Sequence, residues 1–222
     1  MTHDAMRTWG VLSDMDGTLL DTESTWLQVV ERFVLDHGGA DASGIAAACE
    51  GLDLDRAAAR LLERLDLAAA ASAVAQELDR RALAAYSDAV TWRPGAPDLL
   101  RALGEARVPL ALVTSSPRHW VDTFARSVDL SAFRVRVTAD DTVRTKPAPD
   151  PYLDAAAALG LPTARCVALE DSLVGAWSAV SAGCVTVVVG RLGPGLPPGV
   201  HQVGSLSELD VPALRHLAGA AV

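Results

Sequence analysis

Lysine is almost absent from this sequence of 222 residues: its 19 basic residues are 18 arginines and a single lysine, Lys146. The bias toward arginine is a matter of composition, but the one position that departs from it calls for an explanation. Lysine carries a compact point charge that fits a small site better than the broad guanidinium fork of arginine. Lys146 is therefore a candidate site residue, and the alternative is a surface lysine retained by chance.

Other absences exclude whole classes of function. The three cysteines, Cys49, Cys166 and Cys184, are scattered without CxxC spacing, which argues for a reducing compartment and against a zinc site or a disulfide framework. The net charge of −9 comes with no basic run, which argues against nucleic acid and anionic membranes as partners. No apolar run approaches the roughly 18–20 residues of a membrane span. MTHDAMRT at the start does not resemble a secretory signal. We expect a cytoplasmic protein, as a monomer or weak dimer.

Hydrophobic residues make up 50% and charged residues 21%, which is typical of a globular chain. Residues 9–14 read as a short buried strand. From 22 to 86 the apolar residues recur at helical spacing in three stripes, and no strand candidate appears. The stripes begin at Trp26, Leu54 and Val74. The pattern predicts a helical bundle inserted after the first strand.

Beyond residue 95 short apolar strands alternate with helices, which indicates a parallel, helix-covered sheet. The expected strands are 109–113, 135–138, 166–169 and 185–189, and the expected helices are 97–106, 117–128, 151–159 and 172–182. The Gly/Pro-rich stretch 190–199 is expected to be a loop without chemistry. We therefore predict an α/β core with a Rossmann-like sheet, formed by residues 1–20 and 91–222, and a helical unit formed by residues 21–90.

The stretch SDMDGTLLDTE follows the first strand and puts two aspartates one residue apart. A calcium loop that starts at Asp14 would need Gly and Glu where Leu19 and Thr25 stand, so that interpretation fails. A solvated turn explains Asp-Gly, but it does not explain the position at the carboxyl end of a buried strand, where open α/β sheets bind ligands. The remaining interpretation is a catalytic pair, Asp14 and Asp16.

Three other strands present polar residues at the same edge. They are Thr114-Ser115-Ser116 at a helix start, Lys146 in the loop after 135–138, and Glu170-Asp171 after 166–169. A helix N-terminus suits an anion such as phosphate, although Ser-Ser-Pro is also an ordinary cap. Four carboxylates in one cleft repel by about 4 kcal/mol per close pair at an effective dielectric near 20. Such a cluster needs cations, and its oxygen ligands favour Mg²⁺, with Lys146 as the fixed positive charge.

In order and spacing, Asp14-Met-Asp16-Gly-Thr18, Thr114, Lys146 and Glu170-Asp171 resemble the four signature motifs of the haloacid dehalogenase superfamily. KPAPDPY and LEDSLVGAWSAVSAGC resemble the helical-capped subgroup of β-phosphoglucomutase and phosphoglycolate-phosphatase-like enzymes. The resemblance covers nearly the whole predicted core. The helical unit matches that subgroup's cap in position and character, and only loosely in sequence.

The resemblance implies a role for each acidic residue. Asp14 would be the nucleophile that forms an aspartyl-phosphate, and Asp16 would protonate the leaving oxygen and then activate water. The Asp14 carboxylate, the Asp16 main-chain carbonyl and Asp171 would hold Mg²⁺, with Glu170 as a further ligand or a neighbour of the ligands.

The resemblance also implies a site for the transferred phosphoryl group. Thr114, the Ser115 amide and Lys146 would bind it. The cap residues Glu23, Trp26 and Glu50 are expected at the substrate pocket, although core packing is the commoner role of a tryptophan at Trp26 and Trp177. Ser172, Asp140 and Asp141 are expected to act as helix caps or to solvate loops.

Within the superfamily the residues favour one reaction. Dehalogenases lack the second aspartate, and phosphonoacetaldehyde hydrolases need a cap lysine that this chain does not have. β-Phosphoglucomutases carry a histidine and a cationic cap residue where Trp26 and Glu50 stand. The resulting hypothesis is a Mg²⁺-dependent phosphatase acting on a small phosphomonoester, a sugar phosphate or similar metabolite. A mutase is the alternative, and a silent binding protein would require a broken motif, which is not found.

Overall fold

The computed structural model describes residues 9–86 and 90–220, and within them it contains a six-stranded sheet in which all strand pairs are parallel. The strand order is β3-β2-β1-β4-β5-β6. The strands are β1 (Gly10–Ser13), β2 (Leu110–Val113), β3 (Val135–Val137), β4 (Cys166–Glu170), β5 (Val185–Val189) and β6 (His201–Val203). The predicted α/β fold with a Rossmann-like sheet is therefore confirmed.

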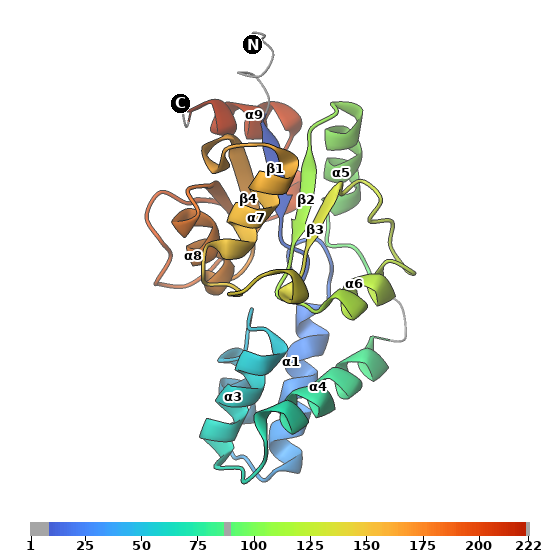
Figure 1. Ribbon diagram of the computed structural model, residues 1–222, viewed down its shortest axis with the longest axis vertical. Coiled ribbons are helices and arrows are strands. Elements are labelled where there is room, and N and C mark those ends of the chain that lie inside the picture. The colour runs from blue at the N-terminus through green and yellow to red at the C-terminus, as the bar shows by residue number, and fades with distance from the viewer. Residues whose placement is uncertain (1–8, 87–89, 221–222) are drawn as a thin grey trace.

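Helices cover both faces of this sheet (Figure 1). They are α5 (Ala96–Glu105), α6 (Arg118–Phe124), α7 (Asp150–Leu159), α8 (Leu173–Ser181) and α9 (Val211–Ala220). Leu12, Ala111 and Ala168 pack with α7 and α8 on one face, and Val11 and Leu112 pack with α5 and α9 on the other. Because both faces are covered, the central strands are continuous apolar runs rather than alternating ones.

The inserted segment forms four helices that lie apart from the sheet in a lobe of their own (Figure 1). They are α1 (Glu23–Asp36), α2 (Ala42–Ala47), α3 (Leu54–Leu65) and α4 (Ala71–Ala85), and we call this lobe the cap. The sequence predicted three of them. It missed α2, which is too short to show a helical period and is capped by Asp41, whose carboxylate accepts the Gly44 N–H at 3.1 Å.

The chain enters and leaves the cap through two connecting segments that lie side by side. Leu20 forms an isolated bridge with Trp92, and the Asp21 N–H donates to the Thr91 carbonyl at 2.9 Å. The predicted boundaries, 20/21 and 90/91, lie beside this crossing and remain predictions. Residues 87–89 are outside the described part of the chain.

Two elements near the C-terminal end, β6 and α9, were not predicted. The strand β6 has three residues and is largely exposed, so it carries no apolar signal. The helix α9 does bury Leu214 and Ala218 at helical spacing, and Asp210 caps it by accepting the Ala213 N–H at 2.7 Å. That spacing could have been read from the sequence. No helix in the described ranges combines the length and apolar character needed to cross a membrane.

The parallel register brings the carboxyl ends of the central strands to one edge. Ser13 at the end of β1 pairs with Leu169 of β4, and the Asp14 N–H donates to the Leu169 carbonyl at 2.9 Å. Thr114 follows β2, and Glu170 is the last residue of β4 rather than the first after it. This edge faces the cap in Figure 1.

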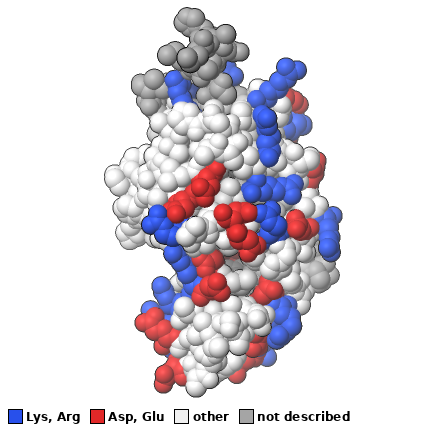
Figure 2. Space-filling model, viewed as in Figure 1, with Lys and Arg blue, Asp and Glu red and all other residues white. Residues whose placement is uncertain are grey.

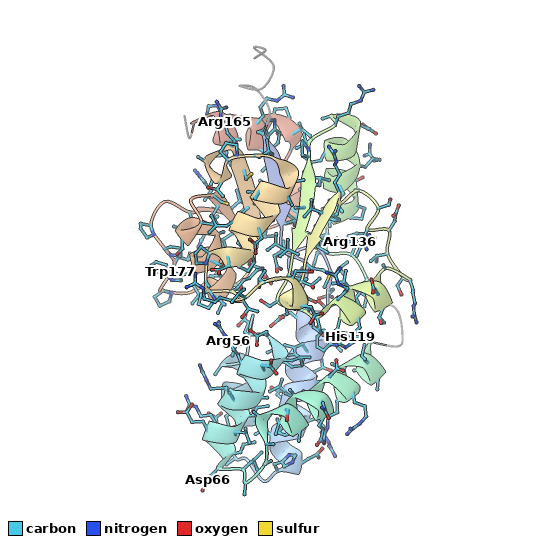
Figure 3. All side chains as sticks on the ribbon, viewed as in Figure 1. Arg56, Asp66, His119, Arg136, Arg165 and Trp177 are labelled. Carbon is cyan, nitrogen blue, oxygen red and sulfur yellow. The ribbon has the colours of Figure 1, made fainter. Side chains whose placement is uncertain are left out.

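Polar contacts join the cap to the core around this edge. Asp79 of α4 accepts from His119 Nε2 at 2.7 Å and from Trp120 Nε1 at 2.6 Å, both on α6. The Arg56 guanidinium of α3 donates to the Lys146 carbonyl. Figure 3 shows Arg56 and His119 at the level where the two lobes meet, one to the left and one to the right. On the face drawn in Figure 2, Asp and Glu side chains gather along the same line, interspersed with arginines.

The cap core predicts a specific stability difference. Leu78 of α4 is 0% exposed and Leu35 of α1 is 56% exposed. We expect Leu78→Ala to lower the free energy of unfolding by about 2–5 kcal/mol because it leaves a cavity among packed side chains. Leu35→Ala, the matched control, should change it by less than about 0.5 kcal/mol. Urea unfolding measures both, and equal effects would contradict the packing described for the cap.

Candidate active site

Lys146 is buried at the sheet edge with its ammonium group between two carboxylates. Its Nζ donates to Asp14 Oδ1 at 2.6 Å, to Glu170 Oε1 at 2.6 Å and to the Val113 carbonyl at 2.9 Å. The side chain is 3% exposed. A buried charge is tolerated only when it is paired and hydrogen-bonded, and all three donors of this ammonium are used. The single lysine of the chain is therefore an internal cation.

The charges around Lys146 do not balance. Burial raises the pKa of the Asp14 carboxyl to about 7, although the Lys146 ammonium lowers it. Burial also raises the pKa of Asp171 well above its usual range, and Asp14 and Glu170 add to this. Burial opposes the charge of Lys146, but the two neighbouring carboxylates raise the pKa of its ammonium. One ammonium group thus faces three acidic groups. A further cation bound here would stabilise their charged forms.

Asp14, Glu170 and Asp171 form a carboxylate cluster suited to a divalent cation. One oxygen from each lies within 4.8 Å of the others. Asp14 Oδ2 is buried and has no hydrogen-bond partner among the described residues. A Cβ at Gly17 would lie 1.9 Å from Asp171 Oδ2, so only glycine lets the chain pass this close to the carboxylate. An all-oxygen donor set of this kind fits Mg²⁺.

Glu170 is fully buried and anchored through both of its carboxylate oxygens. In addition to Lys146, Tyr152 Oη donates to Oε1 at 2.5 Å, and Ser172 Oγ donates to Oε2 at 3.3 Å. Ser172 also caps α8, as predicted, by accepting the Gly175 N–H at 3.0 Å. The contact with Tyr152 was not predicted, because the motif containing this residue drew attention to its lysine alone.

Asp16 is held by three hydroxyl groups and points away from the carboxylate cluster. Thr22 Oγ1 donates to Oδ1 at 2.6 Å, and Thr114 Oγ1 and Ser116 Oγ donate to Oδ2 at 3.0 and 2.8 Å. Its side chain therefore contributes no oxygen to that cluster, and the metal contact expected of its main-chain carbonyl remains a prediction. Sequence reasoning missed Thr22 and Ser116, and the second stands directly beside the predicted Thr114-Ser115 pair.

Ser115 offers the pocket a free hydroxyl group. Its Oγ is buried and makes no hydrogen bond to any described residue. Its neighbour Thr114 is occupied: its Oγ1 donates to Asp16 and accepts the Ser116 N–H at 2.9 Å. Ser115 and Lys146 both line the pocket, and their binding of one anion remains a prediction.

A pocket between core and cap contains most of these groups. Its lining includes the core residues Asp14, Asp16, Thr114, Ser115, Lys146 and Asp171 and the cap residues Glu23, Trp26 and Glu50. Of the predicted site residues, only the fully buried Glu170 lies behind this lining. The pocket holds about 40 Å³ of free space, against roughly 300–1,000 Å³ for an ordinary small-molecule site. In this structure the cap leaves little free space over the site.

Two tryptophan predictions have different outcomes. Trp26 is 5% exposed and packs in the core while also lining the pocket. The prediction for Trp177 is wrong: the side chain is 44% exposed on the outer side of α8, where its Nε1 donates to the Gly195 carbonyl at 2.9 Å (Figure 3). Its indole covers the 190–199 loop rather than the sheet.

The predicted capping role of Asp140 and Asp141 is confirmed by their bonds to the Arg118 and Thr138 N–H groups, both at 2.8 Å.

The fold and the site together define a hydrolase of the haloacid dehalogenase superfamily. The family model of haloacid dehalogenase-like hydrolases matches residues 10–183. The chain belongs to this family, which confirms the resemblance that its motifs indicated.

Individual relatives cover almost the whole chain. Hexitol phosphatase A of Escherichia coli (strain K12) is 33% identical over 224 residues, 93% of this chain and 95% of that protein. Validoxylamine A 7'-phosphate phosphatase of Streptomyces hygroscopicus subsp. limoneus is 30% identical over 201 residues, 90% of each chain. The crystal structure of β-phosphoglucomutase from Clostridium difficile matches with a TM-score of 0.84, at 18% identity over 96% of this chain and 98% of that one, and shares the fold.

The packing around Glu170 predicts which glycine cannot be replaced. A Cβ at Gly175 would lie 2.0 Å from the Glu170 carboxylate, whereas a Cβ at Gly104 in α5 would meet no atom within 4 Å. Glu170 cannot swing aside, because Lys146 and Tyr152 hold it. We expect Gly175→Ala to destabilise the protein by about 1–3 kcal/mol.

Gly104→Ala is the matched control and should be neutral or stabilising by up to about 1 kcal/mol, since alanine favours a helix. Thermal unfolding compares the two variants. A Gly175→Ala variant that melts with the wild type would show that Glu170 is not confined as described.

Proposed function

We propose that the protein is a Mg²⁺-dependent phosphatase that hydrolyses a small phosphomonoester, a sugar phosphate or a similar metabolite. The observation that carries the proposal is the convergence of Asp14, Asp16 and the buried Lys146 in one pocket under the cap. Two relatives with 30% identity or more over nine tenths of this chain are named hexitol phosphatase A and validoxylamine A 7'-phosphate phosphatase.

Asp14 is the proposed nucleophile. Its Oδ2 has no hydrogen-bond partner in the described chain and the residue lines the pocket, so an oxygen is available for attack. A bond forms between this oxygen and phosphorus, and the bond from phosphorus to the substrate oxygen breaks. Water then attacks the phosphorus, the bond to Asp14 breaks, and inorganic phosphate leaves. Lys146 holds Oδ1 and so fixes the direction of Oδ2.

Asp16 is the proposed acid and base. It would give a proton to the departing substrate oxygen and later accept one from the attacking water. The hydroxyl groups of Thr22, Thr114 and Ser116 support this role because they fix the carboxyl group in the pocket. A hydroxyl group can donate a hydrogen bond to the ionised Asp16 carboxylate or accept one from the protonated carboxyl group, so these contacts suit both forms.

The phosphoryl group would lie against Lys146, Thr114 and Ser115, where the unpartnered Ser115 hydroxyl supplies a donor. Asp14, Asp171 and the Asp16 carbonyl would hold Mg²⁺, with Glu170 as a ligand or as the anchor of Lys146. When bound, the cation neutralises phosphoryl oxygens, so that one anion can approach another.

The cap would close over the bound substrate and exclude water. A mutase remains the weaker candidate, because it must rebind a bisphosphate next to Glu50, and the likeness to β-phosphoglucomutase at 18% identity carries the fold alone. A binding protein of the same fold without catalytic activity is not favoured, since each of the four signature motifs keeps its functional residue.

Phosphate release from a panel of phosphorylated metabolites tests the proposal. We expect hydrolysis of at least one compound with Mg²⁺ and none with EDTA, and Asp14→Asn should retain less than about one thousandth of the rate, because the attacking oxygen is lost. The matched control is Asp154→Asn, an exposed aspartate of α7.

Asp154→Asn should keep the wild-type rate and its dependence on Mg²⁺. Full activity of Asp14→Asn, or full activity in EDTA, would contradict the mechanism. Isomerisation that depends on added bisphosphate, with little net phosphate release, would support the mutase instead.

A further inference from the structure

Two glutamates of the cap, Glu23 and Glu50, line the same pocket as the proposed phosphate-binding groups. Glu23 begins α1, and its Oε1 is buried with no hydrogen-bond partner within the described residues. Glu50 lies in the loop after α2 and is exposed, which puts it at the mouth of the pocket. A buried carboxylate oxygen without a partner is uncommon, and it suggests a donor that arrives with the substrate.

Three aromatic residues also line the pocket, Trp26 and Tyr86 from the cap and Trp120 from α6 of the core. Trp26 and Tyr86 each pack edge to face against Trp120, with ring centroids 5.7 and 5.5 Å away. Trp120 Nε1 donates to Asp79, and Tyr86 Oη donates to the Thr22 carbonyl at 3.3 Å. The polar atoms of Trp120 and Tyr86 are therefore already used, whereas Glu23 keeps an unpartnered oxygen.

No spare cation lies in this pocket. Among the described residues that line it, Lys146 is the one with a positive charge, and in the proposed function the phosphoryl group already lies against it. Arg56 lies nearby but directs its guanidinium at the Lys146 carbonyl and at Asp53. Burial, followed by the charges of Asp16, Glu50 and Asp14, raises the pKa of the Glu23 carboxyl to about 8, so one more negative charge is disfavoured in this pocket. A second anionic group on a substrate would meet these acidic residues and no free cation.

We propose that Glu23 and Glu50 select the substrate by charge: the accepted phosphomonoester carries hydroxyl groups and no second anionic group. Glu23 Oε1 accepts a hydroxyl from the leaving group inside the closed pocket, and Glu50 repels anions at the mouth. This inference rests on the proposed phosphatase function. It assigns specificity to two residues that play no part in the phosphoryl transfer itself.

A pair of linear six-carbon substrates that differ in one group tests the inference. Sorbitol 6-phosphate ends in a hydroxymethyl group, and 6-phosphogluconate ends in a carboxylate. With the wild-type protein and Mg²⁺, we expect kcat/KM to favour sorbitol 6-phosphate by at least about 100-fold, as like charges brought together in an interface are strongly rejected. Glu23→Gln with Glu50→Gln should reduce the preference to about tenfold or less, mainly by raising turnover of 6-phosphogluconate.

The control is Glu63→Gln, which removes one negative charge from an exposed position of α3 and should leave the preference unchanged. Since glutamine matches glutamate in shape, the variants should melt close to the wild type, and thermal unfolding checks this. Comparable wild-type rates on both substrates would overturn the inference, and so would an unchanged preference in the double variant. Release of phosphate from no compound at all would instead overturn the phosphatase proposal, and this inference with it.

Discussion

The arrangement of the site depends on one interaction, the contact of the buried Lys146 ammonium with Asp14 and Glu170. Removing two carboxylates from water is costly, and a cation held at 2.6 Å from both offsets much of that cost. The contact also sets the geometry, because it fixes one oxygen of Asp14 and leaves the other unpartnered. All the other Lys or Arg positions of the chain are arginine, and the compact ammonium of lysine is the group that fits between these strand ends.

The fold supplies the convergence on which this contact depends. Parallel register places the ends of β1, β2 and β4 at one level, so residues far apart in the chain meet at the same edge. The insertion after β1 then places a helical cap over that edge. In the proposed function the core carries the groups for phosphoryl transfer, and the cap carries Glu23 and Glu50, which line the same pocket.

Sequence patterns predicted the sheet, the helical insertion and the convergence of Asp14, Lys146 and Glu170, because buried strands and their polar ends leave a local signal. The sequence patterns did not predict which side chains form hydrogen bonds with one another at the carboxyl edge of the sheet. The hydroxyl groups that hold Asp16 and the Tyr152 contact with Glu170 join residues that are six to a hundred positions apart, and nothing in the local pattern marks such pairs. The exposed Trp177 was mistaken for core because large aromatic residues are usually buried, whereas this one covers a loop.

A double-variant cycle on the buried lysine tests the central claim most directly. Lys146→Met removes the charge and keeps the bulk, and it should lower the free energy of unfolding by about 3–5 kcal/mol because it leaves buried carboxylates without a partner. Adding Glu170→Gln removes one of those carboxylates and should restore part of the lost stability, so the two changes are coupled. Urea unfolding of the four proteins in the cycle measures this coupling. A Lys146→Met protein as stable as the wild type, or stability losses that simply add, would contradict the account.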